Sequence, residues 1–201
     1  MSAANDRFFN MSGAPSGEGP NLRPIVLVSL LIISAVLNVA LALRLHSVTK
    51  SDAAPFSSVN MLMDSVPASS LTGEAVKIDL RHGSPETILY IYAPGCGWCA
   101  KNLKNIKQLA HDLHQRGTAE VVGLSLDTAG LHDYLEKADL DFPTYAKMPA
   151  DFLKTYRLGI TPQTLVVKNG VIIRDWRGAY TASVQREVEG FFQVRLPGLT
   201  Q

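Results

Sequence analysis

The chain has 201 residues, of which 46% are hydrophobic, and a formal net charge of +1. This length predicts about one domain of ordinary size once an apolar run and a polar tail are set aside. The near-zero charge gives no indication of nucleic-acid binding or of a strongly charged partner, and no repeat of the solenoid or propeller type is visible.

The N-terminal part combines a polar tail with an apolar run. Residues 1–24 are rich in Gly, Ser, Pro and Asn and predict a disordered tail. Residues 25–43 read IVLVSLLIISAVLNVALAL and contain no charged side chain. As a helix they would span roughly 28 Å, close to the thickness of a bilayer's hydrocarbon core. The run therefore predicts a single transmembrane helix that acts as a signal anchor.

A cleaved signal peptide is the alternative, because Ala40 and Ala42 fit the small-residue cleavage rule. A polar stretch of about 24 residues before the run is long for a signal peptide, which favours the uncleaved anchor. Both interpretations export the C-terminal part, although the flanking charges alone orient the helix weakly. We expect an inner-membrane protein whose C-terminal domain lies on the periplasmic or extracytoplasmic side. Residues 44–71 predict a flexible tether.

Residues 72–201 alternate between the hydrophobic periods of strands and helices. In chain order they predict strands over 75–80 and 87–93, a helix over 99–116 ended by Gly117, a strand over 119–127, helices over 131–138 and 149–159, a hairpin over 164–176 and a helix over 182–194. Asn169-Gly170 marks the hairpin turn. This order predicts an α/β domain whose central mixed sheet carries helices on both faces.

The only two cysteines, Cys96 and Cys99, lie in the stretch YAPGCGWC. A structural disulfide between them would close a very small loop and remove little entropy from the unfolded chain. Zinc needs about four ligands, and there is no second cysteine pair. His111 and His114 share one side of the predicted helix but lie three or four turns beyond the cysteines. His46, His82 and His132 have no ligand partner at recognisable spacing. We therefore predict no metal.

The position of the pair favours reactivity. Cys96 follows the buried strand 87–93 and a Pro94-Gly95 turn, so it lies at the N-terminus of the next helix. Unpaired backbone N–H groups and the helix dipole there stabilise a thiolate and lower its pKa below about 8.5. Cys99, one turn further along, would resolve the mixed disulfide by attacking Cys96. Trp98 between them predicts an apolar contact surface for partners rather than packing on the domain itself.

The strand, the segment APGCGWCAKN and the following helix resemble the thioredoxin superfamily, over residues 72 to 195. A second motif, GITPQTLVVKNGVIIRDWRG at 159–178, resembles the cis-proline segment of that superfamily. The resemblance implies a thioredoxin-like fold in which Pro162 is cis. It also implies that the backbone of Thr161 faces the cysteines and pairs with an extended stretch of a substrate protein. No cofactor is implied.

The anchor, the extra strand and the insertion before Pro162 are most similar to the membrane-anchored TlpA/ResA-like reductases. This resemblance implies a thiol–disulfide oxidoreductase that reduces exported proteins, such as apocytochrome c, and is supplied by a membrane electron donor. The direction of electron flow stays open. Three departures are Gly95 in place of Trp, Tyr90 where thioredoxin has a buried aspartate, and Asn102 where ResA-like proteins have a glutamate. No proton acceptor for Cys99 is therefore identified.

Two alternatives use the same fold. A peroxiredoxin-like peroxidase would need a threonine three residues before the first cysteine, where Ala93 stands. A copper-delivery or assembly protein of the Sco type would have three residues between its cysteines and a distant histidine. This chain has two intervening residues and no histidine near Pro162.

Overall fold

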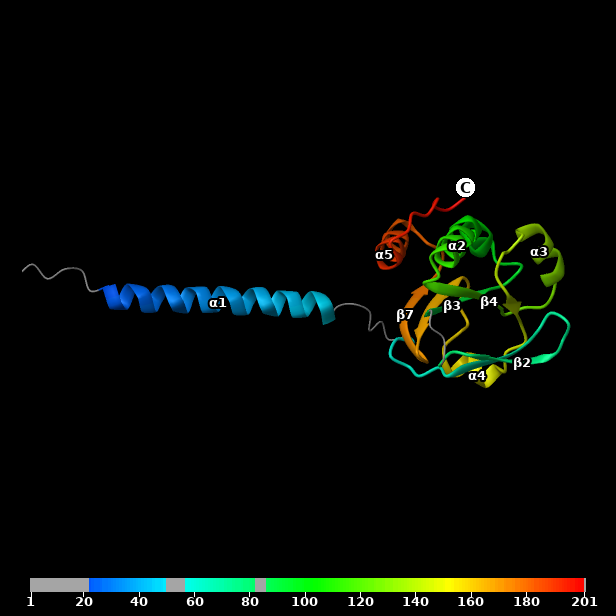
Figure 1. Cartoon of the computed structure of the whole chain (residues 1–201), viewed down its shortest axis with the longest axis horizontal. Helices are drawn as coiled ribbons and strands as arrows, with labels where there is room; N and C mark the ends of the chain where they lie inside the picture. Colours follow the sequence, from blue (N-terminus) through cyan, green and yellow to red (C-terminus); the bar gives the residue numbers. More distant parts are fainter. Residues whose placement is uncertain (1–21, 50–56, 82–85, 201) are drawn as a thin grey trace, which may run out of the picture. The chain divides into compact units, whose positions relative to one another are not determined.

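The computed structural model describes residues 22–49, 57–81 and 86–200. The chain divides into two units, of which the first contains helix α1 (Leu22–Thr49) and the second is a folded domain (Figure 1). The tail predicted over residues 1–24 lies outside the described residues as far as residue 21. Residues 50–56 of the predicted tether also lie outside them.

Helix α1 contains the whole predicted apolar run and continues beyond both of its ends. The structure describes the side chains of residues 26–41 in this helix. The large apolar side chains among them are between 53% and 71% exposed. Within the described residues, no helix combines the length and the apolar character needed to cross a membrane.

A five-stranded mixed sheet lies at the centre of the domain, in the order β5-β4-β3-β6-β7. Its strands are β3 (Glu86–Tyr92), β4 (Ala119–Ser125), β5 (Thr144–Tyr145), β6 (Gln163–Lys168) and β7 (Val171–Arg177). β4 runs parallel to β3 and β5, whereas β6 is antiparallel to β3 and β7. The predicted mixed sheet is therefore confirmed.

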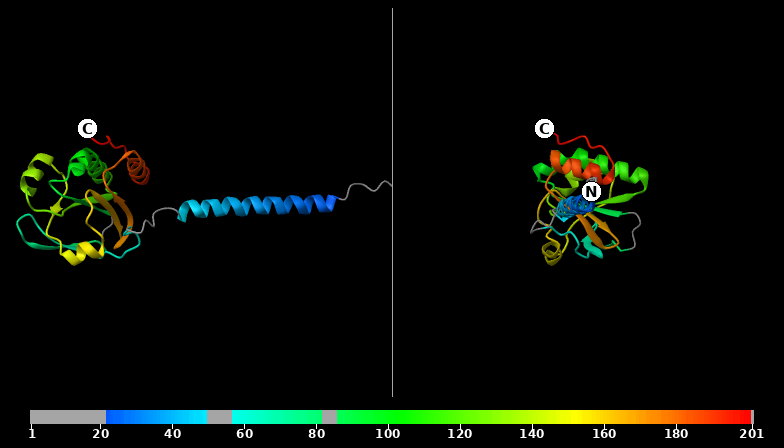
Figure 2. Two further views of the ribbon diagram at one scale, coloured as in Figure 1. Left: turned by 180° about the vertical axis from the view of Figure 1, so that it is seen from behind. Right: turned by 90° about the vertical axis from the view of Figure 1, so that its left-hand side faces the viewer.

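Both faces of this sheet are covered (Figures 1 and 2). One face carries α2 (Gly97–Arg116), α3 (Leu131–Ala138) and α5 (Ala182–Phe192), and the other carries α4 (Ala150–Thr155). The first buried cluster, on the α2 side, includes Ile106 and Val188, and the second includes Met63 and Leu165. The alternation of side chains along each strand therefore divides the core into two layers.

The second face also carries a two-stranded antiparallel sheet of β1 (Ser65–Ser69) and β2 (Ala75–Asp79). β1 lies within the segment predicted as a tether, and Met63 and Val66 there are fully buried. This corrects the predicted boundary, because α1 runs to Thr49 and residues 57–71 belong to the folded domain. The sequence SVPAS carries a weak strand signal, because its only inward-facing side chains are those of Val66 and Ala68.

Helix ends and turns test the remaining predicted boundaries. Gly117 ends α2 in the left-handed conformation, as predicted. Asn169 and Gly170 both have positive φ, as a two-residue hairpin turn requires. The helix predicted over 149–159 ends at Thr155 instead, because Arg157 takes a positive φ that no helix continues through. β5 has only two residues, too few for a periodic signal.

Gly123 in β4 lies where a side chain does not fit. A Cβ atom there would lie 2.5 Å from Thr144 Oγ1 and 3.2 Å from a ring carbon of Phe142. We expect Gly123→Ala to lower the free energy of unfolding by about 1–3 kcal/mol, because overpacking displaces these neighbours. Urea denaturation measures this. The control is Gly190→Ala on α5, where a Cβ meets nothing within 4 Å, and equal stability of the two variants would contradict the prediction.

Candidate active site

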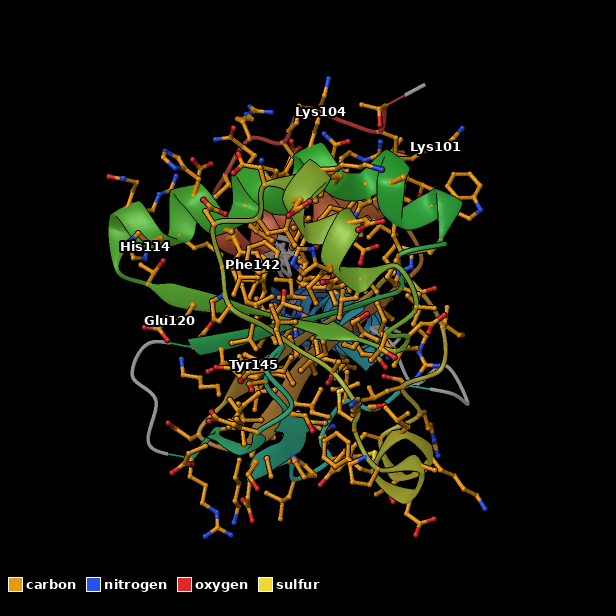
Figure 3. All side chains as sticks on the ribbon, turned by 90° about the vertical axis from the view of Figure 1, so that its right-hand side faces the viewer. Lys101, Lys104, His114, Glu120, Phe142 and Tyr145 are labelled. Atoms are coloured by element: carbon orange, nitrogen blue, oxygen red, sulfur yellow. A yellow bond between two sulfur atoms is a disulfide. The ribbon has the colours of Figure 1, made fainter. Side chains whose placement is uncertain are left out.

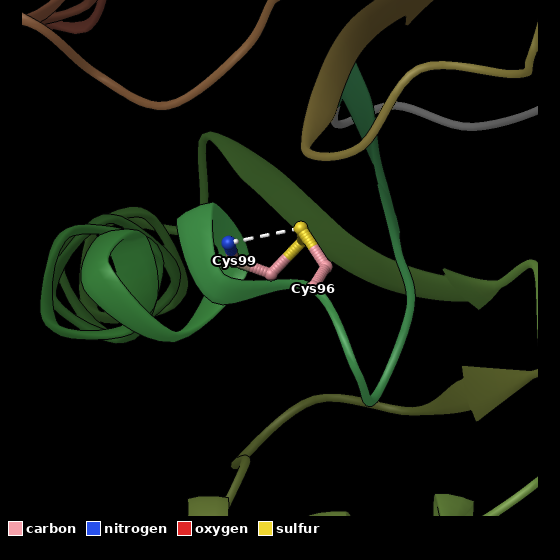
Figure 4. Close-up of a disulfide and its surroundings, with 2 residues drawn as sticks. All are labelled: Cys96 and Cys99. Carbon is pink, nitrogen blue, oxygen red and sulfur yellow. Dashed lines mark hydrogen bonds between the residues drawn. A yellow bond between two sulfur atoms is a disulfide. The ribbon is translucent and has the colours of Figure 1, made fainter.

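Cys96 lies at the junction between β3 and α2. β3 ends at Tyr92, the chain turns, and Cys96 becomes the N-cap residue of α2. The turn is closed by the Cys96 N–H, which donates to the carbonyl of Ala93 at 3.1 Å. Cys96 and Cys99 form a disulfide with their Cα atoms 5.2 Å apart (Figure 4). The structure thus brings both predicted cysteines to the start of the helix.

The start of the helix favours negative charge on Cys96. The Cys99 N–H donates to Cys96 Sγ at 3.1 Å, so a backbone donor already faces that sulfur. The first turn of α2 carries no acidic residue whose negative charge would repel a thiolate there. Cys96 is partly exposed, whereas Cys99 is completely buried. Only the Cys96 sulfur is therefore accessible to a protein substrate.

The Thr161-Pro162 peptide bond is cis, as the resemblance implied. Gln163, the next residue, pairs with Ile91 near the end of β3. Pro162 therefore lies at the same edge of the sheet as the turn that leads into Cys96. Its carbonyl accepts from the Gly178 N–H at 2.7 Å. Among the described residues, nothing pairs with the backbone N–H or C=O of Thr161.

Two large apolar side chains next to these segments are exposed. Trp98, between the cysteines, is 57% exposed, and Ile160, before Thr161, is 47% exposed. Lys101 Nζ lies 5.5 Å from the centre of the Trp98 ring and makes a cation–π contact with it. Trp98 therefore does not pack into the core. The exposure of Ile160 was not predicted, although its place beside Thr161 is a signal for it.

Asn102, which follows Cys99 by three residues on α2, forms a buried polar group with Tyr180 and Thr164. Asn102 Oδ1 accepts from the Tyr180 N–H at 3.0 Å, and the Tyr180 hydroxyl bonds Thr164 Oγ1 at 2.9 Å. Tyr90, which is also buried, stacks on Tyr92 with ring centres 5.7 Å apart. The first buried cluster contains Cys99 together with all three of these tyrosines.

Burial raises the pKa of Tyr90 and of Tyr180, and it raises the pKa of Tyr92 to about 12. These hydroxyls therefore keep their protons at neutral pH. They can donate hydrogen bonds to a sulfur atom, but they are poor general bases.

The carboxylate of Asp175 on β7 is buried. It lies close to the cis-proline segment, because β7 pairs with β6, which begins directly after Pro162. Asp175 accepts from Gln163 Nε2 at 2.7 Å and from Arg177. It pairs across the strands with Leu165, which belongs to the second buried cluster. Cross-strand partners share a face, so Asp175 lies on the side of the sheet opposite Cys99. The carboxylates missing from positions 90 and 102 are therefore not replaced by Asp175.

The predicted absence of ligand partners for histidine needs one correction. His132, Asp133 and Glu136 on α3 place possible ligand atoms within 4.8 Å of one another. All three are exposed, and the i,i+4 spacing of His132 and Glu136 explains their approach. His111 and His114 are exposed on α2. Trp176, to which no role was assigned, is buried and donates to Glu187 at 3.2 Å.

No protein-family model matches the sequence, and no curated protein matches it significantly. The structure does match solved structures. One, assigned as a thiol:disulfide interchange protein DsbE from Chlorobium tepidum, is 18% identical, with 67% of this chain and 96% of that chain covered and a TM-score of 0.57. A thiol:disulfide interchange protein from Bacteroides sp. is 17% identical, with 69% of this chain and 93% of that chain covered and a TM-score of 0.54.

A third is a secreted disulfide oxidoreductase of Mycobacterium tuberculosis that is homologous to DsbE of E. coli. It is 18% identical, covers 63% of this chain and 93% of its own, and has a TM-score of 0.50. At such identities the likeness concerns the fold. The domain has the thioredoxin-like α/β fold that the two motifs predicted.

Proposed function

We propose that this protein is a membrane-anchored thiol–disulfide oxidoreductase that reduces disulfides of exported proteins. One observation carries the proposal: the Cys96–Cys99 pair begins α2 at the same sheet edge as the cis Thr161-Pro162 bond. The names of the solved structures that share this fold, which are thiol:disulfide interchange proteins and oxidoreductases, support the chemistry.

The reaction consists of two exchanges. In the reduced protein, the Cys96 thiolate attacks one sulfur of a substrate disulfide, forms a mixed disulfide and expels the second substrate sulfur as a thiolate. The Cys99 thiolate then attacks Cys96 Sγ, which forms the Cys96–Cys99 disulfide and releases the substrate as a dithiol. The substrate gains two electrons and this protein loses two. A membrane electron-donor protein must therefore reduce the pair again.

The substrate would dock as an extended segment. The unpaired backbone N–H and C=O of Thr161 offer two hydrogen bonds to such a segment, beside Pro162. Trp98 and Ile160 supply exposed apolar surface for its side chains. Binding through such backbone contacts depends little on the sequence of the peptide. This suits a protein that reduces several exported substrates.

Helix α1 would hold the domain at the inner membrane, with the domain on the periplasmic or extracytoplasmic side. Its residues 25–43 carry no charge, and its large apolar side chains are exposed over residues 26–41. Asn38 Nδ2 donates to the carbonyl of Ser34 at 2.9 Å, so the most polar side chain of the run is paired within the helix. The proposal of a spanning helix depends on these features.

Thiol trapping in intact cells tests location and direction together. We expect a membrane-impermeant alkylating reagent to modify the full-length protein at Cys96, because an exported reductant is kept reduced and accessible. The protein should remain in the membrane fraction after an alkaline carbonate wash. A variant without residues 1–49 should be lost from that fraction. A pair found oxidised would contradict the reductase direction, and thiols protected in intact cells but not in lysed cells would contradict export.

A further inference from the structure

Two buried polar atoms on the α2 side of the sheet have no hydrogen-bond partner among the described residues. They are the hydroxyl oxygen of Tyr90 and Nδ2 of Asn102. Tyr90 is 1% exposed and Asn102 is 0% exposed. Buried polar groups are nearly always paired, because leaving one unpaired costs much of its lost hydration. Neither atom is therefore fully satisfied by the contacts of the described chain in its disulfide form.

The orientation of the Asn102 side chain is settled by its neighbours. Its Oδ1 accepts from the Tyr180 N–H at 3.0 Å and from Asn105 Nδ2 at 3.1 Å. A backbone N–H can only donate, so the atom facing Tyr180 must be the oxygen. The amide nitrogen is therefore the atom of Asn102 left without a partner. Asn102 lies close enough to the Tyr90 hydroxyl to lower its pKa, against the larger, raising effect of burial.

Both groups lie on the same side of the sheet as Cys99. Asn102 follows Cys99 by three residues, so the two side chains share one face of the helix. Tyr90, on β3, belongs to the same buried cluster as Cys99. When Asn102 donates to the Tyr90 oxygen, the Tyr90 proton is left to be donated elsewhere. A disulfide sulfur is a weak acceptor, whereas a thiolate is a strong one.

We infer that the Tyr90 hydroxyl, positioned by Asn102, donates a hydrogen bond to the Cys99 thiolate when the disulfide is opened. This inference rests on the proposed function, in which Cys99 resolves the mixed disulfide. Tyr90 keeps its proton throughout and does not act as a base. It raises the fraction of Cys99 present as the attacking thiolate, which compensates for the carboxylates absent from positions 90 and 102.

While Cys96 is bonded to the substrate, or is replaced by serine, the groups that can influence Cys99 in this cluster are neutral. The titratable ones are Cys96 on its own helix, Tyr90 and Tyr92 from β3, Tyr134 from α3 and Tyr180 before α5. Lys101 and Lys104 of α2 are exposed, and Figure 3 shows them on the outer side of this helix. Glu187 on α5 is exposed and accepts from Trp176. A hydrogen-bond donor is therefore the main local influence on the thiolate.

A titration of Cys99 tests the inference without any substrate. In full-length protein carrying Cys96→Ser, the NMR shift of the single cysteine Cβ reports the ionisation of Cys99. We expect Tyr90→Phe to raise the pKa of Cys99 by about one unit, a roughly tenfold loss of thiolate below that pKa. Tyr90→Phe keeps the ring and removes an unpaired group, so the domain should fold at least as stably.

Tyr134→Phe is the matched control, because its hydroxyl is also buried without a partner and its ring lies 5.3 Å from that of Tyr92. It should leave the pKa of Cys99 unchanged. An unchanged pKa in Tyr90→Phe would overturn the inference, and so would an equal rise in both variants, since that would be a general packing effect. Failure of the proposed function would look different: the unsubstituted protein would not catalyse disulfide reduction, whatever the pKa of Cys99.

Discussion

Replacing Cys96 with serine should reduce the catalysed reduction of a protein disulfide to the uncatalysed rate. We expect a loss of roughly three orders of magnitude or more in kcat/KM, the scale seen when an enzyme loses its nucleophile. The reason is geometric, because Cys96 Sγ is the partly exposed sulfur and receives the Cys99 N–H at the helix N-terminus. Reduction of insulin by the purified protein, with dithiothreitol as the electron source, measures the rate.

The unsubstituted protein serves as the reference, and thermal unfolding should show that Cys96→Ser retains the fold. Full activity in Cys96→Ser would exclude Cys96 as the nucleophile. A reference protein that consumes hydrogen peroxide but does not reduce insulin would instead indicate a peroxidase. A reference protein inactive on insulin that binds copper(I) through both thiols would indicate a copper-delivery role.

Replacing Cys99 with serine should have the opposite chemical outcome, because the first exchange proceeds and the second cannot. We expect Cys99→Ser to accumulate covalent adducts with substrate proteins, visible on non-reducing gels and removed by dithiothreitol. Cys99 is completely buried and adjacent to Cys96 Sγ, so it is placed to attack that sulfur but not a bulky substrate. The adducts would also identify the physiological substrates by mass spectrometry.

The double variant Cys96→Ser with Cys99→Ser is the control for Cys99→Ser and should form no adduct. If Cys96→Ser alone forms the adducts and Cys99→Ser does not, the roles of the two cysteines are exchanged. Release of substrate from Cys99→Ser as fast as from the unsubstituted protein would contradict a resolving role for Cys99.

Much of the fold was predictable because local signals in this chain are strong. The apolar alternation and the shift to helical spacing after Cys96 predicted β3, α2 and β4. Gly117 correctly placed the end of α2, and Asn169-Gly170 correctly placed the turn between β6 and β7. β1 and β5 were missed because five and two residues carry too little periodicity. The end of α4 was missed because the positive φ of Arg157 has no signature in its residue type.

For the candidate site, the sequence by itself determined where the cysteine pair lies, at the start of α2. Two cysteines separated by two residues at a strand-to-helix junction predict a thiolate at a helix N-terminus, whatever the rest of the chain does. The cis bond at Thr161-Pro162 was predicted by the resemblance of the segment 159–178 to the cis-proline segment of the thioredoxin superfamily, and it is present.

Only the tertiary structure decided what surrounds the pair, because those neighbours come from strands and loops far apart in the chain. Tyr90 and Asn102 are separated by a turn and part of a helix, and Tyr180, which orients Asn102, follows 78 residues later. The burial of Asp175 on the opposite face depends on the register of β6 and β7. Local sequence sets the conformation of each segment. These contacts form only when the sheet is assembled, because the packing of the core determines which side chains touch.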